Sequence, residues 1–117
     1  MPSLKITHGT WEELQQAAKM IREQVFIQEQ NIAAEYEWDE QDEIAVHFVV
    51  YEQDQVIATA RLLQNHSIGR VAVLKSNRGL GVGKVLMQAV IAYAQQQLRP
   101  FLVLSSQVHA QAFLSLI

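Results

Sequence analysis

The sequence predicts an α/β domain whose sheet has mixed strand directions. Two long stretches place apolar residues at helical spacing, and five shorter runs have the length and composition of strands. Together with a short final stretch they follow the order β-α-β-β-β-α-β-α, which gives the α/β class. The 117 residues, half of them apolar, are enough for one domain with a buried core, so residues 1–117 are predicted as a single domain.

The first elements have clear local signals. Residues 3–9 predict a strand, and Thr10 follows as a helix N-cap, with Glu13 three residues later completing a capping box. A helix is predicted from about residue 11 to 28, because apolar residues recur at helical spacing at Leu14, Ala18, Ile21 and Val25.

An acidic loop, residues 33–43, precedes three predicted strands. Residues 44–52 and 55–63 form a hairpin around the short turn at Gln53 and Asp54, and residues 67–74 form the next strand.

The second half continues with a helix over residues 83–98, ended by Arg99 and Pro100. Residues 101–106 form a continuous apolar run, which predicts a central strand, and residues 108–117 begin as a further helix. The buried stripe of the helix over 83–98 is predicted at Val85, Leu86, Ala89, Val90 and Tyr93.

Composition excludes several classes. The chain has no cysteine, which rules out disulfides and thiolate zinc sites and fits a reducing cytoplasm. No apolar run approaches the ~20 residues of a membrane span, and the N-terminus lacks a secretion signal. We therefore expect a cytoplasmic protein without membrane association.

Charge is divided between the two halves. The net charge of −3 argues against a nucleic-acid partner, yet all twelve acids lie within residues 12–54. The acid-free second half predicts a cationic surface that attracts a polyanionic ligand, unless the segregation is chance; its cations are Arg61, Arg70, Lys75, Arg78, Lys84 and Arg99.

A glycine cluster at residues 78–84, R-G-L-G-V-G-K, joins a predicted strand to a predicted helix. A Walker A loop fails here, because Arg78 stands where it needs glycine and Val85 where it needs Ser or Thr. A dinucleotide fingerprint also fails, because it needs the spacing G-x-G-x-x-G and the chain has G-x-G-x-G. It further needs an acid about 20 residues later, and the chain has none there. What remains is a loop whose N–H groups and Arg78 wrap a pyrophosphate, or a tight turn that serves packing alone.

The same residues carry a family resemblance. Residues 78–83 match the [QR]-x-x-G-x-[GA] signature of the GNAT (Gcn5-related N-acetyltransferase) superfamily, and residues 71–87 resemble the whole of its motif A. Residues 21–32, 37–51 and 107–113 are similar to the ElaA/YjcF-like branch. The resemblance implies the GNAT fold: a mixed, mostly antiparallel central sheet with flanking helices, and a strand pair that splays at motif A.

The resemblance also implies acetyl-CoA as acyl donor and no metal. The pantetheine arm would bond the backbone of Val71, Ala72 and Val73, and the N–H of Val73 would stabilise the oxyanion. Gln107 and Phe113 would contact the cofactor. The pyrophosphate would lie on the loop formed by Arg78, Gly79, Leu80, Gly81, Val82, Gly83 and Lys84.

Other residues have two interpretations each. Glu29 is a candidate acceptor contact or an exposed helix end, and His47, which alternates with Phe48, is a candidate base or a half-exposed strand histidine. His109 could reach the cofactor or simply lie near a strand end. The acidic residues at 35–43 either recognise a cationic amine or form a solvated loop; they lack the spacing of a calcium loop. Trp11 and Trp38 are expected to pack.

The sequence departs from the family at its end. Leu114 stands where the family usually has tyrosine, and the chain ends at Ile117, where the family continues into a β-hairpin. Without that hairpin the apolar strand 101–106 has an open edge, which predicts a homodimer. Two functions therefore stay open: an N-acetyltransferase, active or impaired, acting on a primary amine of a small molecule or protein, and a non-catalytic CoA-binding or interaction domain.

Overall fold

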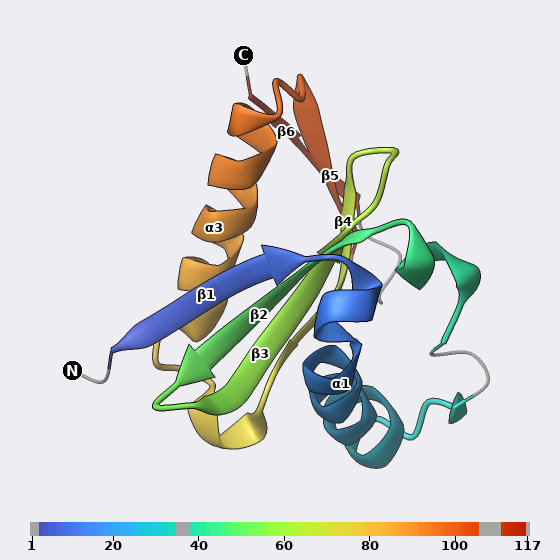
Figure 1. Ribbon diagram of the computed structural model, residues 1–117, viewed down its shortest axis with the longest axis vertical. Coiled ribbons are helices and arrows are strands. Elements are labelled where there is room, and N and C mark those ends of the chain that lie inside the picture. Colours follow the sequence, from blue (N-terminus) through green and yellow to red (C-terminus); the bar gives the residue numbers. More distant parts are fainter. Residues whose placement is uncertain (1–2, 35–37, 106–110, 117) are drawn as a thin grey trace.

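The computed structural model describes residues 3–34, 38–105 and 111–116, which form one six-stranded sheet between helices (Figure 1). The strand order is β1-β2-β3-β4-β5-β6. Neighbouring strands are antiparallel except β4 and β5, which are parallel. The predicted α/β class and mixed sheet are confirmed. The strands are β1 (Leu4–Gly9), β2 (Val46–Glu52), β3 (Gln55–Leu62), β4 (Ser67–Val73), β5 (Phe101–Ser105) and β6 (Gln111–Ser115).

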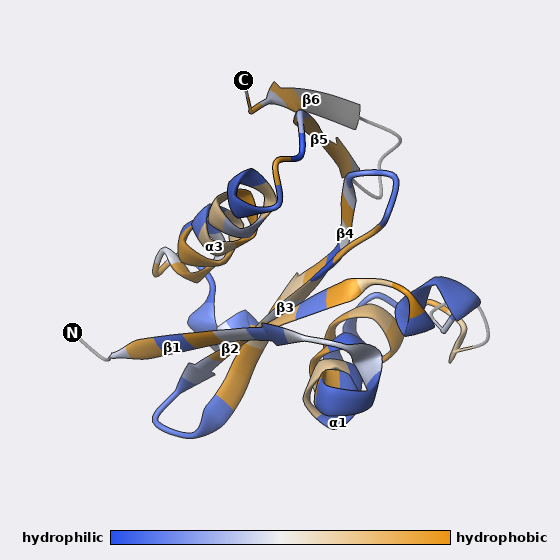
Figure 2. Ribbon diagram, turned by 45° about the horizontal axis from the view of Figure 1, so that its top comes forward, coloured by the Kyte–Doolittle hydropathy of each residue, from blue (hydrophilic) through white to orange (hydrophobic). Residues whose placement is uncertain are grey.

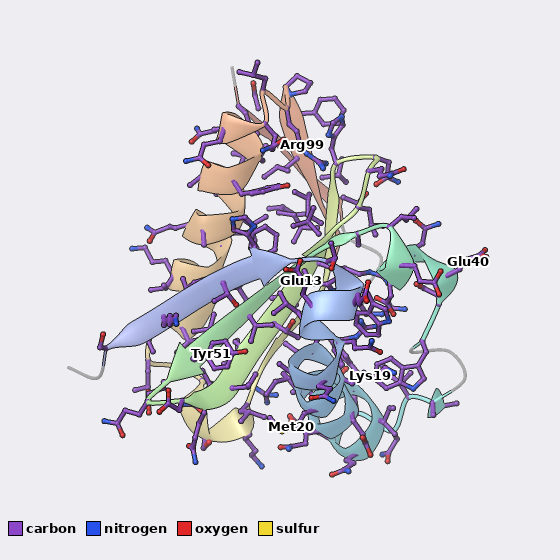
Figure 3. All side chains as sticks on the ribbon, in the orientation of Figure 1. Glu13, Lys19, Met20, Glu40, Tyr51 and Arg99 are labelled. Carbon is purple, nitrogen blue, oxygen red and sulfur yellow. The ribbon has the colours of Figure 1, made fainter. Side chains whose placement is uncertain are left out.

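The first helix begins where the capping box predicts. The Thr10 hydroxyl accepts from the Glu13 N–H at 3.2 Å, and the Glu13 carboxylate accepts from the Thr10 N–H at 2.9 Å. Glu13 lies at this first turn of α1 (Trp11–Arg22) in Figure 3. The helical path then continues to Glu29, but as a π-helix, η1 (Glu23–Glu29), a wider coil that is found mostly as short pieces near functional sites.

Helices cover both faces of the sheet (Figure 2). On one face, Leu86 and Val90 of α3 (Val82–Gln96) pack against Phe48, Ala60 and other strand residues. These two members of the predicted buried stripe are confirmed. Val85, Ala89 and Tyr93 are only half-buried, and Val82 and Ala94 complete the buried stripe. On the other face, residues of α1 and η1 pack on β4: Ile21, Val25 and Phe26 against Ala72.

The hairpin turn and a bulge shape the middle of the sheet. Gln53 and Asp54 both have positive φ (50° and 71°), as a two-residue hairpin turn with matching twist requires. In β4 the register with β3 shifts near Arg70, whose φ is +50°. Ile68 and Ala72, although four residues apart, therefore pack on opposite faces.

The predicted final helix is wrong in its described part. Residues 111–115 form β6, which pairs antiparallel with β5, Leu102 opposite Leu114 and Val103 opposite Phe113. Because short apolar runs fit a strand as well as a helix, periodicity could not separate the two. Strand β5 is central, as predicted, with β4 and β6 on its two sides, so its edge is not open. This removes the reason for expecting a homodimer, and the oligomeric state stays a prediction.

Two short 3₁₀ helices complete the described elements, η2 (Glu40–Glu43) before β2 and η3 (Lys75–Asn77) after β4. The acidic loop therefore has regular structure in its last residues.

Candidate functional site

The end of β4 presents backbone groups on the side away from β3. The Leu74 N–H donates to the Ile57 carbonyl at 2.9 Å, so Leu74 faces β3. Since successive residues of a strand alternate, the N–H and C=O of Val73 face the other side, whereas those of Ala72 face β3. The pairs between β4 and β5 in the described part of the chain are Ser67 with Val103 and Ile68 with Leu104. Val71 and Val73 lie beyond them.

Two of the three glycines in the loop adopt a backbone conformation that favours glycine. Gly79 and Gly81 have φ of +78° and +85°, a region that side-chain-bearing residues rarely adopt, and Gly81 is the N-cap of α3. Gly83 has no such φ. A Cβ built at Gly79, Gly81 or Gly83 would meet nothing within 4 Å, so the space beside all three is open.

The start of α3 adds unpaired donors and positive charge to this open space. The Val85 N–H donates to the Gly81 carbonyl at 3.1 Å, so the N–H groups of Val82, Gly83 and Lys84 precede the first helical bond. The first turn of α3 contains no acid, and Lys84 is exposed there. This open cradle, with a helix N-terminus behind it, has the features of an anion-binding site. Leu80, predicted with these residues, is 71% exposed.

Arg78 does not extend alone into this space. Its Nη1 and Nη2 donate to the two carboxylate oxygens of Glu29 at 2.5 and 2.8 Å, and its Nε donates to the Val73 carbonyl at 2.9 Å. These hydrogen bonds from Arg78 hold the pKa of the Glu29 carboxyl below its ordinary value. The structure thus brings together the predicted residues Glu29, Val73 and Arg78, but pairs the first and last with each other.

A second polar cluster, which the sequence did not predict, lies between α1, η2 and β3. The Asp42 carboxylate accepts from Arg22 at 2.7 and 3.2 Å and from Arg61 at 2.9 Å, and all three residues are buried. Asp39 accepts from Arg61 at 2.7 and 3.0 Å and from Arg70 at 3.4 Å.

This cluster corrects two expectations. Asp42 is buried, not solvated, and neither Asp39, which is exposed, nor Asp42 is free to recognise an amine, because arginines occupy their carboxylates. Arg61 and Arg70 are likewise not part of an open cationic surface, since acids of the first half neutralise them. Trp38 packs as predicted, 4.9 Å from the Arg22 guanidinium. The separation of acids and cations along the sequence was the only signal for this cluster, and it does not predict which acid pairs with which arginine.

His47 faces opposite to Phe48, as predicted, yet it is 1% exposed and does not line an open cleft. Its Nε2 lies 2.8 Å from the Asp42 carbonyl oxygen, and Trp11 packs on its ring at 4.7 Å. Burial lowers the pKa of His47. The expectation of a half-exposed histidine or cleft base fails because α1 begins directly over this end of β2.

The remaining predicted contacts lie at the end of the chain. Gln107 and His109 are outside the described residues. Phe113, predicted on a helix, has its backbone in β6 opposite Val103.

Acid should weaken the fold partly through Asp39. The hydrogen-bonded Arg61 guanidinium keeps the pKa of Asp39 below its ordinary value. A carboxylate with a lower pKa in the folded state stabilises the fold above its unfolded pKa, near ~4, and this contribution is lost as the pH falls through the folded pKa. We expect Tm to fall from pH 5 toward roughly pH 3, and to fall less in Asp39→Asn. Calorimetry over this pH range measures the effect. If Tm fell equally steeply with pH in wild type and in Asp39→Asn, this role of Asp39 would be contradicted.

The fold agrees with comparisons to known proteins. The chain belongs to the acetyltransferase (GNAT) family, whose model matches residues 10–116. It is 35% identical over 105 residues to YjcF of Bacillus subtilis, described as an uncharacterized N-acetyltransferase, across 87% of this chain and 75% of the relative.

Solved structures give the same result. A crystal structure of an acyl-CoA N-acyltransferase from Pseudomonas aeruginosa has 28% identity and a TM-score of 0.79, covering 92% of this chain and 82% of that one. Escherichia coli ElaA has 26% identity and a TM-score of 0.76, covering 93% and 80%. The chain is thus a member of the ElaA/YjcF-like branch, as the sequence resemblance indicates. These likenesses support N-acetyltransferase activity, and proteins of this fold family bind acyl-CoA.

Residues 3–34, 38–105 and 111–116 contain no group of three or more His, Cys, Asp or Glu side chains placed to hold a metal ion. Within the same ranges, no helix combines the length and apolarity needed to cross a membrane.

Proposed function

We propose that this chain transfers the acetyl group of acetyl-CoA to a primary amine of an acceptor. The observation that carries the proposal is the pairing of an open glycine cradle at the start of α3 with the outward-facing backbone of Val73. The cradle suits the pyrophosphate, and the strand end suits the pantetheine arm that runs from it. The cradle residues are those that the sequence singled out for this role.

The reaction requires little covalent work from the protein. The neutral amine attacks the thioester carbonyl, a C–N bond forms and the C–S bond breaks. The N–H of Val73, on the side of β4 away from β3, would donate to the oxyanion that develops in between. The attacking nitrogen loses a proton to water, and the CoA thiolate takes one from water. Positioning therefore supplies most of the acceleration.

The test separates binding from chemistry. Acetyl-CoA is titrated by calorimetry, and thiol release is then measured with a polyamine, an amino sugar, an amino acid and a lysine peptide. We expect binding together with amine-dependent thiol release above the rate with buffer alone. Binding without release across the panel would instead support a non-catalytic CoA-binding domain, and absence of CoA binding would overturn both the transferase and the CoA-binding domain.

A further inference from the structure

Glu29 and Arg78 join three segments that are distant in the sequence. Glu29 ends η1, Arg78 belongs to the glycine loop, and Val73 ends β4. We infer that this pair, here called the Glu29–Arg78 clasp, positions Val73 and the glycine loop for acetyl transfer, and that neither side chain contacts the acceptor amine or the pyrophosphate. The inference rests on the proposed function.

The hydrogen bonds of Arg78 argue against a phosphate contact. Both terminal nitrogens meet the two oxygens of Glu29, which is the bidentate geometry preferred by guanidinium and carboxylate. The third contact, from Nε, goes to the Val73 carbonyl. All three contacts point the side chain toward η1 and β4, and Glu29 compensates its charge. The charge for an anion would then come from Lys84 and from the N–H groups of α3.

The same geometry argues against an acceptor contact by Glu29. Both of its carboxylate oxygens already accept from Arg78, so an ammonium could be bound only by giving up that bidentate pair. The π-helical turn sets this placement, since the Gln30 N–H reaches back five residues to the Val25 carbonyl at 3.1 Å.

The clasp controls the position of the Val73 backbone at the end of β4. The Val73 carbonyl, held by Arg78, and the Val73 N–H, the proposed oxyanion donor, face the same side of β4. Loss of the clasp would free this strand end and the loop that follows it. A shift of about 1 Å at a reacting centre can cost a large factor in rate even when the substrate still binds.

The experiment is a double-mutant cycle with Glu29→Gln and Arg78→Lys. We expect each single variant to lower kcat roughly fivefold, within the range for partly exposed ion pairs, while the KM for acetyl-CoA changes little. The double variant should be no worse than Arg78→Lys alone, because Arg78→Lys already removes the bidentate pair that Glu29→Gln removes. Glu23→Gln, an exposed carboxylate on the same π-helix, is the matched control and should behave as wild type.

Other roles give other patterns. If Arg78 bound the pyrophosphate, Arg78→Lys would weaken CoA in calorimetry and Glu29→Gln would tighten it. If Glu29 bound the acceptor, Glu29→Gln would raise the acceptor KM and its effect would add to that of Arg78→Lys. Either pattern would overturn the inference.

Amide hydrogen exchange over residues 73–81 provides a readout independent of activity. We expect faster exchange in both single variants and no further increase in the double one. A wild-type protein that releases no thiol but shows this coupled exchange would retain the clasp and lose the proposed function. An active protein with no coupling would retain the function and lose the clasp.

Discussion

Asp42→Asn should lower the free energy of unfolding by about 3–5 kcal/mol, the cost of breaking a buried ion pair by removing one partner. Asp42 is 2% exposed, and its carboxylate faces the guanidinium groups of both Arg22 and Arg61. Asparagine keeps the shape of the side chain but removes the negative charge. The guanidinium groups of two buried arginines would then face a neutral amide. Its NH2 group is itself a hydrogen-bond donor and cannot accept from them.

Urea unfolding followed by circular dichroism measures this effect. Glu40→Gln is the matched control, since Glu40 is exposed in the same η2 turn, at the outer side of the molecule in Figure 3. Surface substitutions of this kind change stability by about 0.5 kcal/mol or less. If Asp42→Asn and Glu40→Gln gave the same midpoint, the buried cluster would not be what stabilises this end of the sheet.

The location of the Asp42 cluster could not be derived from the sequence. Asp42 was visible as one acid in an acidic stretch, and Arg61 as one cation in an acid-free half. Their contact depends on how η2 folds back over β3, which is a tertiary arrangement. For the same reason the alternation of His47 and Phe48 was predictable, but not that Trp11 covers His47.

Local signals were reliable where a few neighbouring residues determine the geometry. The capping box at Thr10 and Glu13 and the hairpin turn at Gln53 and Asp54 depend only on adjacent residues, and both are confirmed. The glycine loop is similar, because φ at Gly79 and Gly81 follows from the tight connection into α3. Strand β6 depends instead on pairing with β5, and there the predicted helix was wrong.

Gly81→Val should reduce the affinity for CoA about a hundredfold or more, and this rests on the proposed function. Gly81 has φ +85°, which a β-branched residue adopts only with strain of about 1–3 kcal/mol. The backbone would escape that strain by turning, and the N–H groups at the start of α3 would turn with it. Each charge-assisted hydrogen bond lost to the pyrophosphate costs a further ~1.5–3 kcal/mol, and every ~1.4 kcal/mol is tenfold in affinity.

The valine side chain would also enter the space beside Gly81, which is open to 4 Å. Gly69→Ala is the control, because Gly69 lies in β4 without positive φ and with equally open surroundings. It should bind CoA as wild type does, and both variants should stay folded, since Gly81 is exposed. Calorimetric titration with CoA decides the matter. A folded Gly81→Val variant with unchanged affinity would mean that the glycine loop serves chain geometry alone, and that CoA, if bound, is held elsewhere.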